Sequence, residues 1–287
     1  MALSLPGAEP TAAGDLGGPS AWERLTAKAG KAEVLRGDAY LREVWAELSM
    51  AGGTEGAYRF AEQVGLLWVR PDCFAAGKAR AVLAAVRAAG FRAVGTEVVR
   101  LDWRGVRSLW AYELARATRE RLWLLDAVAG LGPSLLVLYA DDRPGEKGVA
   151  RRLTSLKGSN DPLARSAGSL REVTGSPNRA LTMVHTANDG ADVVREMGVL
   201  CSPAARRRLI PAVMRRLESG RCALTRARRT VEEELPALGV PSAVEPVHTV
   251  EPLFEGSLEQ RWRAVWGAAA TWPLLATRPA APWWSAS

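Results

Sequence analysis

The chain of 287 residues has only two histidines, His185 and His248. His185 follows the apolar run ALTMV and precedes the helix-like segment NDGADVVREMG, so it stands where a strand ends and a helix begins. A neutral imidazole has a lone pair that can attack an electrophile, and histidine changes its charge near neutral pH. A satisfied structural histidine is the alternative that the residue alone leaves open. His248, in a proline-rich tail, is interpreted as inert.

Strand and helix patterns alternate on both sides of His185. The runs GLLWV and PSLLVLYA are typical of buried strands, whereas FRAVGTEVV alternates like a half-buried strand. The segment AGKARAVLAAVRAAG has a helical apolar stripe and ends at Gly90, a natural helix stop. The predicted order is strand, helix, strand, helices, strand, helix, loop, strand, helix. An α+β fold of the ferredoxin-like type, an antiparallel sheet with helices on one face, accommodates this order.

Composition narrows the classes of protein that the chain can belong to. No apolar run approaches the roughly 20 residues of a membrane-spanning helix, and the N-terminal residues lack the pattern of a signal peptide. Three cysteines in no metal-ligand spacing fit a reducing compartment, so we expect a cytoplasmic protein without a structural zinc site. The net charge of +7 favours an anionic partner.

Three ordered motifs resemble the nucleoside diphosphate kinase family over about residues 64–201. The segment LLWVRPDCFAAGKARAVLAAVRAAGFRAVG is similar to the family's first strand, helix and second strand with its Lys-Pro-Asp motif. The segment KGSNDPLARSAGSLRE is similar to its phosphate-side loop, and VHTANDGADVVREMG to its His-Gly-Ser-Asp-Ser signature. His185 and Glu196 keep the family's interval of eleven residues.

The resemblance implies a ping-pong phosphoryl transfer that uses magnesium bound with the nucleotide. His185 would take the γ-phosphate from a nucleoside triphosphate such as ATP and pass it to a nucleoside diphosphate. Glu196, on the following helix, would hold the imidazole in one orientation. Arg171 falls on the arginine of the family's Gly-Thr-Ile-Arg motif, and Arg70 replaces the lysine of Lys-Pro-Asp. These cations would stabilise the charge of the transferred group.

Several family positions are changed in this chain. The loop threonine is Asn160, an expected asparagine is Thr182, the serine after the histidine is Ala187, and the following aspartate is Asn188. An arginine expected before the loop glycine falls at Thr154. We expect Asn160, Thr182 and Asn188 still to contact the nucleotide or its phosphates. Further candidates for phosphate contacts are Arg151 and Arg152, and those for base stacking are Tyr112 and Trp123.

We therefore predict three parts: a lead-in and helical extension at 1–63, the kinase-like domain at 64–201, and a basic helical and Trp-rich extension at 202–287. Family members assemble through the sheet edge and neighbouring helices. The extensions would block larger assemblies, so we expect a homodimer. Trp262, Trp266 and Trp272 are expected on the core or on a second subunit, since exposed tryptophans are costly.

Two other functions stay open at this stage. The changed ligands fit a nucleotide-binding or regulatory module that keeps the fold and has lost turnover. Nine arginines between Arg206 and Arg229 are most simply a solvated helix face with a buried apolar stripe, and a nucleic-acid surface is the weaker alternative. No aromatic residues lie among these arginines, which argues against a base-stacking platform.

Overall fold

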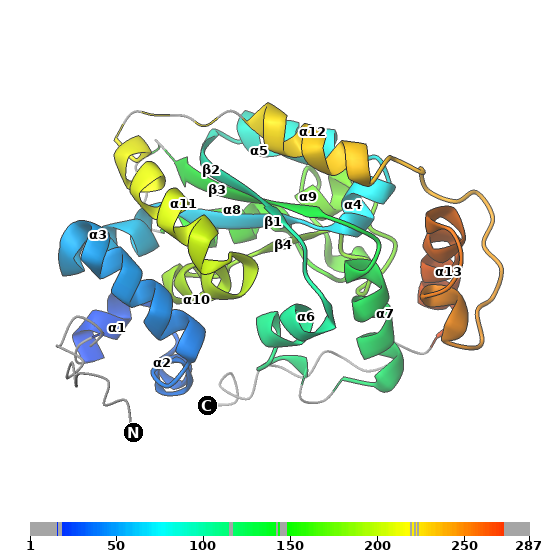
Figure 1. The fold of residues 1–287 in the computed structure, drawn as a ribbon, viewed down its shortest axis with the longest axis horizontal. Coiled ribbons are helices and arrows are strands. Elements are labelled where there is room, and N and C mark those ends of the chain that lie inside the picture. Colours follow the sequence, from blue (N-terminus) through cyan, green and yellow to red (C-terminus); the bar gives the residue numbers. More distant parts are fainter. Residues whose placement is uncertain are drawn as a thin grey trace, which may run out of the picture.

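The computed structural model describes residues 16, 19–114, 117–141, 143, 148–218, 220, 222 and 224–272 of the chain. Its centre is a sheet with strand order β2-β3-β1-β4, in which every neighbouring pair is antiparallel. The strands are β1 (Gly65–Val69), β2 (Phe91–Val99), β3 (Ser134–Asp141) and β4 (Val184–Thr186). Helices join β1 to β2 and β3 to β4, so this order is ferredoxin-like and the predicted fold class is confirmed (Figure 1).

Helices make up most of the rest of the described chain. Those between β1 and the end of the predicted domain are α4 (Pro71–Ala75), α5 (Ala79–Ala88), α6 (Trp103–Leu109), α7 (Arg119–Ala129), α8 (Val149–Lys157), α9 (Leu170–Val173) and α10 (Gly190–Leu200), with the 3-10 turn Pro162–Ala164. The extensions carry α1 (Pro19–Leu25), α2 (Ala29–Leu35), α3 (Ala39–Gln63), α11 (Pro203–Arg216), α12 (Leu224–Glu234) and α13 (Leu258–Thr271), with the 3-10 turn Glu251–Leu253. None of the helices in the described ranges has the length and hydropathy to cross a membrane. The division at residues 63 and 201 stays a prediction.

Helices cover both faces of the sheet, whereas the sequence predicted helices on one face. Side chains alternate along a strand, so Leu67 and Val137 enter one core cluster while Trp68 and Leu136 enter the other. The first cluster includes residues of α5, α7, α12 and α13, among them the buried Trp262. The second includes residues of α3, α10 and α11, and α12 and α10 lie on opposite sides of the sheet in Figure 1. The second face is therefore covered by α3 and α11 of the extensions together with α10 of the predicted domain, whereas α12 and α13 of the C-terminal extension pack on the first face.

Two glycines let α10 lie close against α3. A Cβ atom at Gly190 would stand 2.8 Å from the carbonyl oxygen of Ala61, and one at Gly198 would stand 2.8 Å from the carbonyl oxygen of Tyr40. These neighbours are backbone atoms, which cannot rotate away as a side chain can. The two helices are thus in close contact near both ends of α10.

The chain covers the outer edge of β2 with its own C-terminal extension. The backbone N–H of Cys222 donates to the carbonyl oxygen of Ala93 at 2.9 Å, and Arg216 Nη1 donates to the carbonyl oxygen of Val94 at 3.0 Å. An uncovered edge strand would present such groups to another chain. At Gly95, a Cβ would stand 2.7 Å from Val213 Cγ2 of α11, so glycine permits this close packing.

Candidate active site

His185 and Glu196 form a hydrogen-bonded pair. His185 is the middle residue of β4, Glu196 lies on α10, and His185 Nε2 is 2.9 Å from Glu196 Oε2. Both residues are buried. Burial raises the pKa of Glu196, and the neighbouring imidazole acts against that shift. Among the described residues, the other ring nitrogen, Nδ1, has no hydrogen-bond partner.

A tight turn leads into β4, where the sequence predicted a longer strand. Met183 has a φ of +59°, which non-glycine residues rarely adopt, and the Val184 N–H donates to the Thr182 carbonyl oxygen at 2.6 Å. Asp72 Oδ2 accepts the Met183 N–H at 3.2 Å, and Arg70 Nη1 donates to Thr182 Oγ1 at 2.7 Å. The Arg-Pro-Asp segment after β1 therefore holds the turn that sets the start of β4.

A cavity of about 190 Å³ opens beside this turn. Six predicted site residues line it: His185, Arg70, Arg171, Asn160, Thr182 and Asn188. The structure adds Trp110, Glu113, Arg121, Leu125, Lys157, Arg179 and Ala180 to the lining. Five of these thirteen side chains are basic and one is acidic, so the cavity favours an anionic ligand.

Two cations of the lining are deeply buried. Arg171 Nη1 donates to the Gly158 carbonyl oxygen at 3.0 Å, and Lys157 Nζ donates to the Thr186 carbonyl oxygen at 3.4 Å. Burial lowers the pKa of Arg171 to about 10, and Arg70 adds to the shift. Burial also lowers the pKa of Lys157 to about 8, with a further contribution from Arg171. Positive charges therefore crowd together in a poorly solvated place.

Trp110 forms an aromatic wall of the cavity. Its ring meets the His185 ring edge to face, with centroids 5.6 Å apart and planes at 82°. The Arg70 guanidinium carbon lies 5.7 Å from the centroid of the same tryptophan ring. Trp110 thus contacts both the histidine and a candidate phosphate-binding cation.

The two aromatic residues predicted to stack on a base do not line this cavity. The Tyr112 hydroxyl donates to Asp38 Oδ2 at 2.9 Å, because the turn after α6 directs this side chain toward α3. Trp123 packs edge to face on Trp272, with centroids 6.2 Å apart, at the side of the first core cluster. In this part of the chain, Trp110 lies nearer to the site histidine than either residue.

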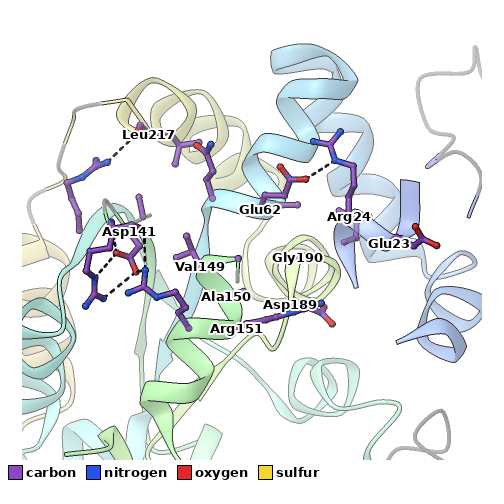
Figure 2. Close-up of a pocket in the computed structure, with 18 residues that line it drawn as sticks. Glu23, Arg24, Glu62, Asp141, Val149, Ala150, Arg151, Asp189, Gly190 and Leu217 are labelled. Atoms are coloured by element: carbon purple, nitrogen blue, oxygen red, sulfur yellow. Dashed lines mark hydrogen bonds and ion pairs between the residues drawn. The ribbon is translucent and has the colours of Figure 1, made fainter. Parts of the chain in front are cut away.

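Arg151 and Arg152 also lie away from the site histidine. Both line a separate cavity of about 610 Å³, in which Figure 2 labels Arg151 and Asp141. Arg152 pairs with Asp141. Both arginines belong to the first turn of α8. At about 1.5 Å of rise per residue, Arg151 stands about 9 Å along the helix from Lys157. The end of α8 that approaches the site is therefore its last turn.

Sequence reasoning missed Lys157, Trp110, Arg121 and Arg179. A signal existed for Lys157, which follows Thr154 by three residues and so shares its helix face. The other three carry no such signal, since each reaches the cavity from a segment whose placement depends on tertiary packing.

No protein-family model and no curated protein matches the chain. Solved structures of nucleoside diphosphate kinases are similar to half of it. They include the Halobacterium salinarum enzyme in complex with CDP, at 17% identity and a TM-score of 0.41, covering 50% of this chain and 90% of that one. For the Aquifex aeolicus enzyme the values are 16%, 0.42, 50% and 97%. For the Borrelia burgdorferi enzyme with bound vanadate and ADP, they are 17%, 0.38, 50% and 89%. The likeness is one of fold, over half of this chain.

Proposed function

We propose that this protein is a nucleotide-dependent phosphotransferase that resembles nucleoside diphosphate kinase and uses His185 as its nucleophile. The observation that carries the proposal is the buried pair of His185 and Glu196, 2.9 Å apart, at a cavity lined by five basic side chains. The order of motifs in the sequence gives independent support. The ligands would be a nucleoside triphosphate and a nucleoside diphosphate or a related acceptor.

The proposed chemistry uses the two ring nitrogens differently. With Nε2–H donated to Glu196, the lone pair of Nδ1 attacks the γ-phosphorus of the donor. An N–P bond forms, the bond to the bridging oxygen breaks, and the nucleoside diphosphate leaves with that electron pair. An oxygen of the acceptor then attacks the same phosphorus, and the N–P electrons return to Nδ1. Arg70 and Arg171 would stabilise the charge on the phosphoryl oxygens.

Magnesium fits this site as a companion of the nucleotide. Within the described residues, no group of three or more His, Cys, Asp or Glu side chains could hold a metal ion. The cavity itself has one lining carboxylate, Glu113. Mg²⁺ would therefore be held mainly by the phosphates, where it supplies charge neutralisation.

The test is phosphorylation of the protein by γ-labelled ATP with magnesium. We expect acid-labile, base-stable label on the wild-type protein and on His248→Ala, and none on His185→Ala. His248→Ala is the control because it removes the other histidine, which is exposed. Label that persists in His185→Ala would refute the proposed nucleophile.

A second candidate is a nucleotide-binding regulator without turnover. The position of Arg70 favours it, because one of its nitrogens is bonded to Thr182 and its Nε lies 3.3 Å from Asp72 Oδ1. These partners compete with a phosphate. Calorimetric binding of ADP with no labelled phosphate on the protein would support this candidate, and exchange of label between nucleotides would exclude it.

The nine arginines between Arg206 and Arg229 support a nucleic-acid partner only in part, because three of them form ion pairs within the chain, whereas Arg207, Arg215, Arg226 and Arg229 are exposed. Arg206 pairs with Glu43 and Glu47, Arg208 with Glu97, and Arg228 with Glu232. Their charge is largely used within the chain. Absence of salt-sensitive RNA binding would remove this function.

We also propose that the protein is cytoplasmic and that it forms a homodimer. A cytoplasmic location is supported by Cys73, Cys201 and Cys222, which are all free thiols. For a homodimer, the contacts of the C-terminal extension with Ala93 and Val94 compete with strand addition at that edge of β2, which favours another surface for the proposed dimer. Light scattering tests the dimer, and a monomer or hexamer would refute it.

A further inference from the structure

Lys157 is a buried cation with no ion pair in the described part of the chain. It is 8% exposed, and its hydrogen bond is the 3.4 Å contact from Nζ to the Thr186 carbonyl oxygen. It lines the cavity that contains His185. A buried ammonium without an anionic partner is costly, and a folded protein rarely retains one.

The charges around Lys157 do not neutralise it. From α9, Arg171 opposes its protonation, whereas Glu196 and Asp192 on α10 and Glu113 after α6 act in its favour from a distance. None of these carboxylates forms an ion pair with it. An anion bound in the cavity would therefore contact both Lys157 and Arg171.

Thr154 occupies the position on α8 where the resemblance expects a positive charge, and its contacts differ from those of an arginine. The resemblance places an arginine at Thr154, but here its Oγ1 is 2.7 Å from Thr186 Oγ1 and donates to the Ala187 carbonyl oxygen at 2.8 Å. These bonds fasten α8 to β4 and the residue that follows it. Lys157 lies three residues later, on the same helix face, at the end of α8 that lines the cavity.

We propose that Lys157 is a phosphate-binding residue of this site, which supplies from the last turn of α8 the positive charge that the resemblance places one turn earlier. The inference rests on the proposed function and adds a residue to it. An ammonium presents three donors and follows a phosphate as a point charge, so its contacts differ from the planar, two-pronged contacts of arginine.

The test is calorimetric binding of Mg²⁺-ADP and of inorganic tripolyphosphate at pH 7. Loss of one charge-assisted hydrogen bond should weaken binding of both probes to Lys157→Met by about 10- to 100-fold. Lys157→Arg should recover most of this affinity. Arg87→Met removes one positive charge from the exposed face of α5 and should bind like the wild type.

A second readout requires no variant. Mg²⁺-ADP is already fully charged above pH 7, so loss of the Lys157 proton should weaken wild-type binding of this probe by about ten-fold between pH 7 and pH 9. Lys157→Arg should show no such loss.

Wild-type affinity for Lys157→Met, or a wild-type affinity that does not change with pH, would overturn the role of Lys157 and leave the proposed function standing. If the wild type binds neither probe, the role of Lys157 is refuted together with the nucleotide site. The labelling of His185 reports on the proposed function separately.

Discussion

Two lysines are buried among the described residues, and their surroundings are opposite. Lys31, on α2, is 3% exposed, and its Nζ lies 2.7 Å from Asp189 Oδ1 and 2.6 Å from Asp192 Oδ1. Burial opposes its charge, but the two carboxylates outweigh burial and raise its pKa. Lys157, on α8, has no such partner, and burial lowers its pKa.

The difference separates a charge that connects parts of the fold from a charge kept for a ligand. Lys31 joins the N-terminal extension to the start of α10, where Asp189 caps the helix. Its removal leaves carboxylates buried without a cation. Lys157 connects no elements by an ion pair, so its removal leaves no buried charge behind. Burial alone does not distinguish the two, whereas the count of carboxylate partners does.

The largest expected effect is on the Lys31 side. Lys31→Met should lower the free energy of unfolding by about 3–5 kcal/mol, because Asp189 and Asp192 stay buried without their partner. Denaturant unfolding at pH 7 measures it. Lys28→Met, which removes an exposed lysine next to α2, is the matched control and should change little. A loss below 1 kcal/mol in Lys31→Met would break the comparison.

Removal of Lys157 is expected to raise the free energy of unfolding at pH 7, whereas removal of Lys31 lowers it. Its pKa is 10.5 in ordinary surroundings and about 8 in the fold, so the unfolded chain holds more protons between these values. The contribution of Lys157 to stability should therefore rise with pH from 8 to 10.5, by on the order of 3 kcal/mol. It is read from the difference between the wild type and Lys157→Met, because buried thiols such as Cys201 titrate in both proteins. Lys157→Met should lack this rise and be more stable than the wild type at pH 7. Parallel stability curves for the two proteins, measured by denaturant unfolding across this pH range, would contradict the assignment.

Arg70 lies between the two cases, since it has one carboxylate and one hydroxyl as partners. Thr182→Val removes the hydroxyl with little change in volume and should cost about 1–2 kcal/mol of unfolding free energy. Thr230→Val is the control, because the Thr230 hydroxyl donates only to a carbonyl of its own helix. Equal losses in the two variants, by urea unfolding, would mean that the buried guanidinium does not depend on its neutral partner.

The smallest effect is expected where a pair is exposed. Arg263 Nη2 lies 3.1 Å from Glu259 Oε1 on α13, and both side chains are more than half exposed. Arg263→Gln should change the free energy of unfolding by less than about 0.5 kcal/mol, and less still in high salt. A loss of unfolding free energy as large as that in Lys31→Met would show that ion pairing alone, without burial, sets the size of the effect.

Local patterns in the sequence account for much of the fold. The strands β1 and β3 and the helix α10 follow from apolar periodicity and from the cap at Asp189. The prediction of helices on one face was wrong, although a continuous apolar run such as GLLWV is typical of a strand covered on both faces. Such a run does not reveal which helices supply the second layer, because that depends on tertiary packing. The turn at Met183 was also missed, because its positive φ is imposed by Asp72 from another segment.

The candidate site also has a part that the sequence predicted and a part that it did not. The sequence placed His185, Glu196, Arg70 and Arg171 through motifs whose residues keep their order and spacing, and the structure brings these four together. Arg151 and Arg152, predicted for phosphate contacts, line a different cavity from His185, because the first turn and the last turn of α8 end at different cavities. Only the direction of α8 decides between them.

The close contact of α10 with α3 bears on the reorganisation energy of the proposed reaction. Gly190 and Gly198 hold α10 against backbone atoms near both of its ends, and Glu196 lies between these two points. Movement of α10 toward α3 is therefore opposed at two points of the helix. When positive charge develops on the imidazole, the carboxylate is already in place, and little of the barrier would be spent on moving it.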